Sequence, residues 1–249
     1  MLNTQRCVIL SLALLVAIGL LAGISSGQED IVLVDFNTTQ DAIPDGWELV
    51  VNQGNADLRL TPEHDGQALH LRSHNASFAL QKETHLDLQK NPFLIWTWKV
   101  TQLPDGGDFR KRKTDDQAAQ LIVSFSATRF ISYIWDSTVP KDVYGKAPSP
   151  PFRKIIAWVV QSGPRALGEW KTERRNLVED YTQLFGEAPQ ALKGVRIQIN
   201  SQHTRSQAAA AWKSIILSSG QQRVSRSIDH RLVARRPGVA FTNSFSSKP

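Results

Sequence analysis

The feature that most constrains the fold of this chain is a strict alternation of apolar and polar residues in short runs. In segment 93–100, for example, every second residue is apolar. The four that share one side of an extended chain are Leu94, Trp96, Trp98 and Val100. A period of two indicates strands that are buried on one face. The chain is therefore predicted to fold mainly into β-strands.

The same pattern returns often enough to predict about ten or more strands. The predicted strands are 31–36, 47–51, 68–72, 77–81, 93–100, 119–125, 131–135, 154–161, 169–175, 195–199 and 212–217. Turn signals such as Pro44-Asp45-Gly46 separate them. Strands at this spacing predict one domain of two packed antiparallel sheets, a jelly-roll-like β-sandwich over residues 28–218.

One segment has a helical rather than an extended pattern. Asn176 can cap a helix in which apolar residues recur at helical intervals, and Gly186 would end that helix. Residues 208–211 are ambiguous, because alanine favours a helix whereas the segment that follows them favours a strand. The sandwich is thus expected to carry one short helix.

The N-terminus has the layout of a signal peptide. Arg6 precedes an apolar run at 8–24, and small residues follow it up to Gly27. We predict a leader at 1–27 and a periplasmic or secreted protein with no membrane span after cleavage. An uncleaved membrane anchor is the alternative. The single cysteine, Cys7, lies in this leader, so the mature chain is expected to lack disulfides, zinc–cysteine sites and cysteine nucleophiles.

The net charge of +6 belongs to the C-terminal tail rather than to the predicted domain. Residues 219–249 carry six basic residues against Asp229 alone, whereas residues 28–218 carry 22 basic and 22 acidic residues. A neutral domain is not expected to bind nucleic acid. The tail is rich in Ser, Gly and Pro and is predicted to be disordered, with a contact to anionic envelope lipid or polymer as the alternative.

The familiar catalytic motifs are absent from the sequence. It has no Gly-x-Ser-x-Gly elbow, no His-Glu-x-x-His, no Walker loop and no dinucleotide-binding fingerprint. Four histidines stand at irregular intervals between residues 64 and 85 and predict no metal site. No catalytic residue is assigned, which favours a non-catalytic protein without excluding an enzyme.

The long polar connection at residues 102–117 holds the first candidate binding site. Its Asp115 and Asp116 point to opposite sides of the chain if they enter the next strand. A carboxylate that is buried there must be paired or coordinated. Two explanations stay open: a calcium-type oxygen site, or the more ordinary salt bridge to Arg129, Arg174 or Arg175.

A second candidate site lies at the end of a predicted strand, beside a loop at 139–151 that is rich in Pro and Ser. It consists of Tyr133, Trp135 and Asp136. Aromatic rings pack protein cores, and they also stack on the apolar faces of sugars, so both roles stay open. Together with the two aspartates of the polar connection, these residues form the predicted ligand site.

A polysaccharide hydrolase or lyase is the alternative function, because glycoside hydrolysis needs two carboxyl groups at a suitable separation. The sequence offers candidates but cannot measure their spacing. They are Asp116, Asp136, Glu169, Glu179 and Asp180.

Several motifs follow one another in a recognisable order. They are Trp96-x-Trp98-Lys-Val, Asp115-Asp116-x-Ala118-Ala119, Tyr133-x-Trp135, Gly168-x-Trp170 and Arg175-Asn176-x-x-x-Asp180-Tyr181. In this order and spacing, over about residues 34–217, the chain resembles the bacterial secreted family called domain of unknown function 3047. The resemblance implies a bacterial envelope or secreted protein and brings no established activity.

One segment departs from the pattern of that family. After the strand at 195–199 the family is typically acidic, of the Asp-x-Asp-x-Thr kind, whereas this chain has Asn200-Ser201-Gln202-His203-Thr204. If the family's carboxylates meet the aspartates of the polar connection around a cation, this chain has lost two hard anionic ligands. Asn200 and Gln202 offer only neutral oxygens, so a calcium site is less expected here.

The leading hypothesis is a non-catalytic β-sandwich that binds a carbohydrate or another envelope polymer. The predicted ligand site is Asp115, Asp116, Tyr133, Trp135 and Asp136. No cofactor is expected, apart from the weaker calcium alternative. A structural envelope protein whose aromatic residues are all core is a third explanation.

Overall fold

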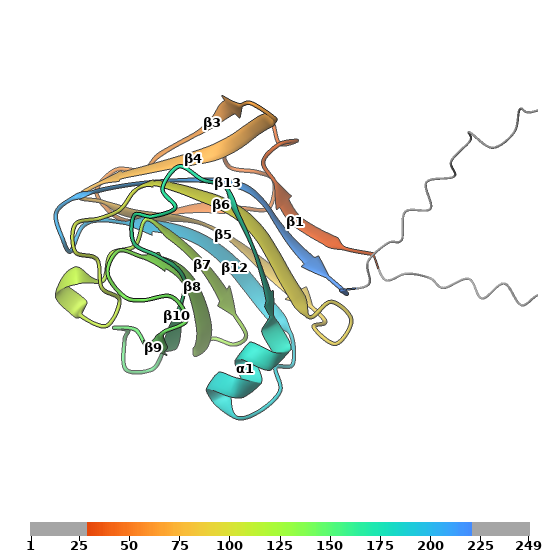
Figure 1. The fold of residues 1–249 in the computed structure, drawn as a ribbon. Coiled ribbons are helices and arrows are strands. Elements are labelled where there is room, and N and C mark those ends of the chain that lie inside the picture. The colour runs from red at the N-terminus through yellow and green to blue at the C-terminus, as the bar shows by residue number, and fades with distance from the viewer. Residues whose placement is uncertain (1–28, 221–249) are drawn as a thin grey trace, which may run out of the picture.

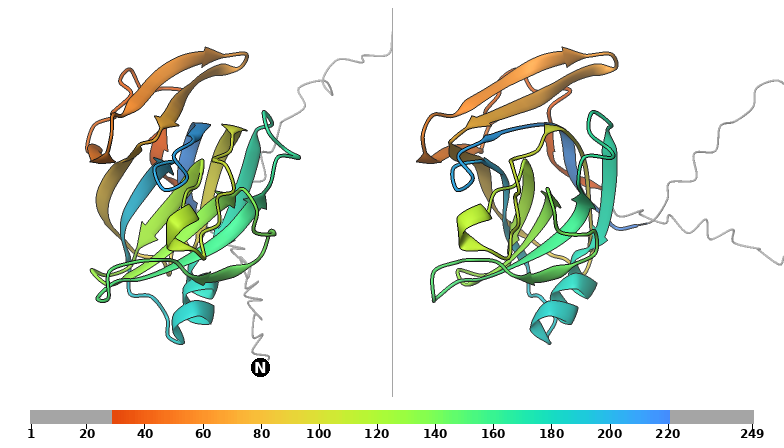
Figure 2. Two further views of the ribbon diagram at one scale, coloured as in Figure 1. Left: turned by 90° about the vertical axis from the view of Figure 1, so that its left-hand side faces the viewer. Right: turned by 60° about the vertical axis from the view of Figure 1, so that its left-hand side comes forward.

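The computed structural model describes residues 29–220, and its strands form two sheets that face each other (Figures 1 and 2). This confirms the predicted mostly β, jelly-roll-like sandwich with one short helix. The predicted leader at 1–27, and the predicted tail beyond residue 220, lie outside the described residues. Within the described range, no helix has the length and apolar character that a bilayer crossing requires.

The first sheet has six strands, in the order β11-β6-β13-β4-β3, with β1 also paired to β13. These strands are β1 (Ile31–Asp35), β3 (Asp57–Glu63), β4 (Gly66–His74), β6 (Phe93–Gln102), β11 (Lys171–Asn176) and β13 (Gln207–Ser218). The second sheet has seven strands, in the order β2-β5-β12-β7-β8-β10-β9. These strands are β2 (Glu48–Gln53), β5 (Ser77–Leu86), β7 (Ala119–Ser124), β8 (Arg129–Asp136), β9 (Tyr144–Lys146), β10 (Lys154–Ser162) and β12 (Leu192–Asn200).

The sequence pattern predicted two antiparallel sheets. The seven-stranded sheet is instead mixed, because it contains one parallel pair. The parallel pair is β8–β10. After β8 the chain forms β9 at the edge of the sheet, and β10 then fills the place between β8 and β9, antiparallel to β9. The sequence analysis did not predict two strands. One is β3, an edge strand that tolerates Pro62, and the other is β9, which is only three residues long.

The alanine-rich segment at 208–211 is a strand, because its place in the sheet outweighs the helix propensity of alanine. It lies between β4 and β6, and Ala210 pairs with Leu71 on one side and Val100 on the other. A central strand with backbone partners on both sides satisfies every N–H and C=O group.

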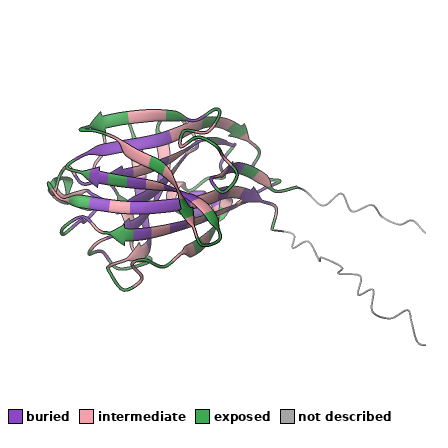
Figure 3. Ribbon diagram, turned by 90° about the horizontal axis from the view of Figure 1, so that it is seen from above, coloured by how far each residue is buried: buried purple, intermediate pink, exposed green. Residues whose placement is uncertain are grey.

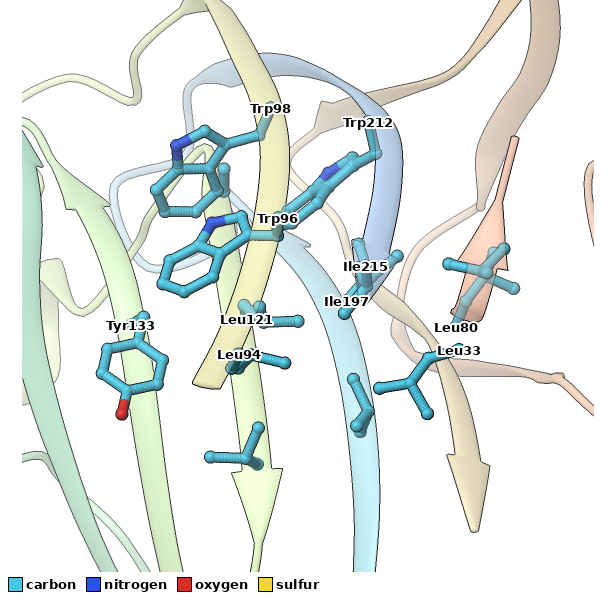
Figure 4. Close-up of a cluster of buried hydrophobic side chains, with 14 of the residues drawn as sticks. Leu33, Leu80, Leu94, Trp96, Trp98, Leu121, Tyr133, Ile197, Trp212 and Ile215 are labelled. Atoms are coloured by element: carbon cyan, nitrogen blue, oxygen red, sulfur yellow. The ribbon is translucent and has the colours of Figure 1, made fainter. Parts of the chain in front are cut away.

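The core lies between the two sheets and is rich in tryptophan (Figure 4). Trp96 and Trp98 on β6 and Trp212 on β13 are fully buried, and the alternation of buried and accessible residues along the strands is visible in Figure 3. Trp98 meets Trp212 edge to face, with ring centroids 5.1 Å apart. The predicted inward face of segment 93–100 is therefore confirmed.

The predicted helix is α1 (Leu177–Phe185), which lies at one end of the sandwich (Figure 1). The side chain of Asn176 accepts hydrogen bonds from the backbone N–H groups of Val178 and Glu179, which caps the N-terminus. Gly186 ends the helix in the left-handed conformation that favours glycine, with a φ of 80°. Both boundaries agree with the sequence prediction.

Candidate functional site

Asp116 is completely buried, and the loop between β12 and β13 surrounds its carboxylate. The N–H and hydroxyl of Thr204 donate to Oδ2 at 2.6 and 2.8 Å. The amide of Asn200 donates to Oδ1 at 3.0 Å, and Nδ1 of His203 lies 3.1 Å from the same oxygen. The segment that departs from the family pattern therefore does contact Asp116. Asp116 holds that loop against the connection between β6 and β7.

The predicted salt bridge of Asp116 is wrong, because Arg175 pairs with Asp180, Arg129 with Glu187, and Arg174 lies over the ring of Phe93. The calcium alternative stays a prediction. Both carboxylate oxygens of Asp116 accept protein donors, and residues 29–220 contain no group of three or more His, Cys, Asp or Glu side chains that could hold a metal ion.

Asp115 differs from its neighbour because its side chain is only partly buried. It accepts one hydrogen bond, from Nε2 of Gln117 at 3.2 Å. The pKa of Asp115 is raised to about 6, mainly by burial. The hydrogen bond from Gln117 and the charge of His203 lower it by less, and the charges of Asp116 and Asp136 raise it. Asp115 is thus a carboxyl group whose charge changes close to neutral pH.

Tyr133 and Trp135 lie inside the sandwich, and neither has any exposed surface. The ring of Tyr133 packs on Trp96 with centroids 5.2 Å apart, and Trp135 packs on Trp98 at 6.1 Å. The hydroxyl of Tyr133 donates to Asp180 at 2.6 Å. Because both rings point into the core, neither is available for stacking on a ligand at the surface.

Asp136 is also fully buried and anchors two loops. Its Oδ1 accepts from the N–H groups of Thr138 and Val139, at 2.9 and 2.8 Å, and its Oδ2 accepts from the N–H of Phe109 at 3.1 Å. Burial raises its pKa, and these three backbone hydrogen bonds lower it by less. Asp136 thus ties the connection at 103–118 to the end of β8.

The connection at 103–118 covers part of the outer face of the seven-stranded sheet, the face that points away from the core. Phe109 packs there in a second apolar cluster with Ile134 and Val159 from β8 and β10. Four of the five predicted site residues thus hold or fill the structure, and Asp115 alone is partly exposed. Their ligand-binding role stays a prediction. The uncovered part of the same face, over β2, β5, β12 and β7, has a different character.

The part of the outer face over β2, β5, β12 and β7 carries five amide side chains around one guanidinium group, which we call the amide row. Its members are Asn52, Gln81, Gln120, Arg196, Gln198 and Asn200. Two of its members, Gln120 and Asn200, are buried, and the other four are at least partly exposed. They share a face because residues two apart on a strand, and residues opposite in an antiparallel pair, point the same way. In register, Arg196 stands opposite Gln81, and Gln198 stands opposite Gln120.

Arg196 lies at the centre of the amide row, and all its hydrogen bonds go to neutral oxygens. Nε donates to Gln198 at 2.9 Å, Nη1 to Gln81 at 3.0 Å and Nη2 to Asn52 at 3.3 Å. At the far end of the row, Nε2 of Gln120 donates to Oδ1 of Asn200 at 2.6 Å. Asn200 also bonds to Asp116, and this second pair is related to the Arg196 group by the register of Gln198 opposite Gln120 rather than by a hydrogen bond.

Sequence reasoning missed the amide row, although a signal for it exists. Segment 195–200 reads Val-Arg-Ile-Gln-Ile-Asn, so every polar residue on the outer side of this strand carries a planar hydrogen-bonding group. The cross-strand register that joins these residues to Gln81 and Gln120 is a tertiary feature. No pattern within one strand contains it.

Several solved structures share features of this fold at low identity. The xyloglucanase domain of NopAA, a type three effector from Sinorhizobium fredii solved in complex with cellobiose, is 9% identical, with 70% of this chain and 94% of that chain covered and a TM-score of 0.44. The family 11 carbohydrate-binding module of the cellulase Lic26A-Cel5E of Clostridium thermocellum is 10% identical, with coverages of 78% and 96% and a TM-score of 0.41.

Endoglucanase cel12A from Rhodothermus marinus is 9% identical, with 69% of this chain and 92% of that chain covered and a TM-score of 0.42. At these scores the likenesses do not bear on what the present chain binds. The sequence matches none of the curated proteins at a significant level. The model of one protein family, described as a protein of unknown function (DUF3047), matches residues 45–216. Because this match covers more than half of the chain, the protein belongs to the DUF3047 family.

Proposed function

We propose that the protein is a non-catalytic binding protein for a polysaccharide, and that it binds this polymer on the outer face of the seven-stranded sheet. The observation that carries the proposal is the amide row. A row of planar amide and guanidinium groups, fixed on rigid strands, suits the recognition of vicinal hydroxyl groups with little loss of side-chain entropy on binding.

Unused donors in the row support this function. Oε1 of Gln198 accepts from Arg196, while its Nε2 group has no partner among residues 29–220. The guanidinium of Arg196 likewise has N–H groups beyond the three that bind Gln198, Gln81 and Asn52. Both side chains are partly accessible, so these donors are free to meet a ligand.

Apolar side chains on the same face suit the C–H faces of sugar rings. Ile122 stands directly opposite Arg196 in the strand register and is partly exposed. Phe130, also partly exposed, points outward from β8, and the turn before β10 adds Phe152, a residue that is 66% exposed. Polar and apolar groups side by side are what the amphipathic surface of a saccharide requires.

The polymer class follows from the predicted leader, which lies outside the described residues. A leader would deliver the domain to the periplasm or the exterior, where envelope polysaccharides are the abundant polyhydroxyl ligands. The proposed site differs from the five residues that the sequence analysis named. Of those five residues it keeps only Asp115, whose backbone oxygen accepts a hydrogen bond from Asn200 of the amide row. The other four have buried side chains and are not part of the proposed site.

Polysaccharide hydrolysis is the second candidate, and the raised pKa of Asp115 is the observation that favours it. A carboxyl group that holds its proton up to about pH 6 is a suitable general acid. The mechanism needs a second free carboxylate. Of the other carboxylates considered for this role, Asp116, Asp136 and Asp180 are buried and hydrogen-bonded within the domain, and Glu169 pairs with Lys171. The fifth, Glu179, is exposed in the first turn of α1.

A glycan screen with a matched pair of variants tests the proposal. We expect the purified full chain to be retained on at least one neutral or acidic polysaccharide. Gln198→Ala should then raise the Kd about five- to tenfold, because it removes one amide partner worth about 1 kcal/mol. The control is Gln207→Ala, the same change at an exposed position on β13 of the other sheet.

Isothermal titration calorimetry gives the affinities, and a reducing-end assay on the same samples detects hydrolysis. Absence of retention on every polymer would contradict the binding function. Equal affinities of the Gln198 variant and the unmodified protein would put the binding surface elsewhere. Release of reducing ends that Asp115→Asn abolishes would favour the hydrolase.

A further inference from the structure

Arg196 is the one partly buried arginine among residues 29–220 that lacks an ion pair. The other two with intermediate exposure, Arg129 and Arg175, bind the carboxylates of Glu187 and Asp180. The remaining arginines in this range are exposed, so water solvates their charge. Taking a cation partly out of water without a counter-ion costs free energy, which neutral amide oxygens offset only in part.

The nearest charges make this deficit larger. Arg153, in the turn before β10, is close enough for its charge to lower the pKa of Arg196, in the same direction as the larger effect of burial. The charge of Glu48 raises the pKa of Arg196, but by less. Glu48 does not bind Arg196 itself and accepts a hydrogen bond from Nε2 of Gln81 instead. The uncovered outer face therefore carries an excess of positive charge around Arg196.

Arg153 is placed by aromatic side chains rather than by an acid. Its guanidinium carbon lies 5.7 Å from the ring centroids of both Phe130 and Phe152. Contacts of this kind orient the planar group without neutralising it. Two arginines, with apolar rings beside them, thus share one face of a domain whose overall charge is balanced.

We propose that the ligand of this face is an acidic polysaccharide, and that one sugar-borne oxyanion pairs with Arg196, with Arg153 as the second cation. This inference rests on the proposed binding function and names the class of polymer. Carboxylate and sulfate groups both fit a guanidinium fork, so the shared chemistry is a sugar-borne oxyanion. An anion at Arg196 would supply the missing counter-charge without disturbing the three amide contacts.

Binding to matched polymer pairs tests the inference. We expect the full chain to bind polygalacturonate at least tenfold more tightly than methyl-esterified polygalacturonate, which has the same backbone without the charge. Dextran sulfate against dextran gives the corresponding comparison for sulfate. Arg196→Gln should abolish the preference, and Arg153→Gln should reduce it. Arg196→Lys keeps the charge but not the fork, and should retain part of the preference.

The controls separate the possible failures. Arg59→Gln removes an exposed arginine from the other sheet and should leave the preference unchanged. The basic residues of 219–249 are present in every variant, so a preference that survives Arg196→Gln would assign the binding to the tail and overturn the inference. Equal binding of charged and neutral polymers would overturn the acidic class but leave the binding function intact. Failure to bind any polymer would remove both. Thermal melts verify that each variant is folded.

Discussion

Replacement of Asp180 by alanine is expected to destabilise the domain by about 3–5 kcal/mol, the range found when one partner of a buried ion pair is removed. Nε and Nη2 of Arg175 donate to the two oxygens of Asp180 at 2.8 and 2.6 Å, and the hydroxyl of Tyr133 donates to Oδ2 at 2.6 Å. The side chain of Asp180 is only 7% exposed. Its removal leaves a cation and a phenol without an acceptor at the junction of α1 and the core.

Differential scanning calorimetry measures the effect, which corresponds to a fall in Tm of about 10 °C for a domain of this size. The control is Glu179→Ala on the exposed side of the same helix, which should change the stability by less than about 0.5 kcal/mol. If Asp180→Ala melts within 2 °C of the unmodified protein, roughly the effect of a surface change, the ion pair does not anchor α1.

The second large effect is expected at Asp116, whose replacement by alanine should cost about 3 kcal/mol. Both oxygens are engaged, and the two hydrogen bonds from Thr204 are short, at 2.6 and 2.8 Å. Without the carboxylate, the N–H of Thr204 loses its acceptor, whereas the amide of Asn200 keeps the backbone oxygen of Asp115. The loop between β12 and β13 is then held less firmly against the connection at 103–118, most of all at Thr204.

Urea denaturation gives the loss of stability, and hydrogen exchange at the Thr204 amide reports the release of the loop. Asp105→Ala, at an exposed position in the same connection, is the matched control and should leave both readouts unchanged. Unchanged protection of the Thr204 amide in Asp116→Ala would show that the carboxylate does not hold this loop.

The fold was predictable from the sequence where one strand alone carries the signal. The alternation in segment 93–100 predicted which side of β6 is buried, and Asn176 and Gly186 predicted both ends of α1. The strand at 208–211 was not predictable, because its state depends on partners in β4 and β6. The parallel pair β8–β10 depends on where the three-residue strand β9 docks, which no local pattern specifies.

The site was predictable only in part, for a related reason. Residue type suggested that Tyr133, Trp135 and Asp136 could meet a ligand, but the same types also fill cores and anchor loops, and here they are fully buried. The segment after β12, which departs from the family's pattern, contacts Asp116, a contact that the sequence analysis had raised only as a condition for a cation site. The amide row escaped notice because glutamine and asparagine on separate strands become a surface only through the register of four strands.

The central claim is that the outer face of the seven-stranded sheet is the ligand surface. Its most direct test is a titration of the isotope-labelled full chain with an oligogalacturonate, and separately with a neutral cello-oligosaccharide, followed by amide chemical shifts. We expect the largest shifts at Gln81, Arg196 and Gln198, with smaller shifts at Ile122 and Phe130. Shifts confined to the six-stranded sheet, for example at Thr97 and Lys99, or to residues 219–249, would contradict the claim.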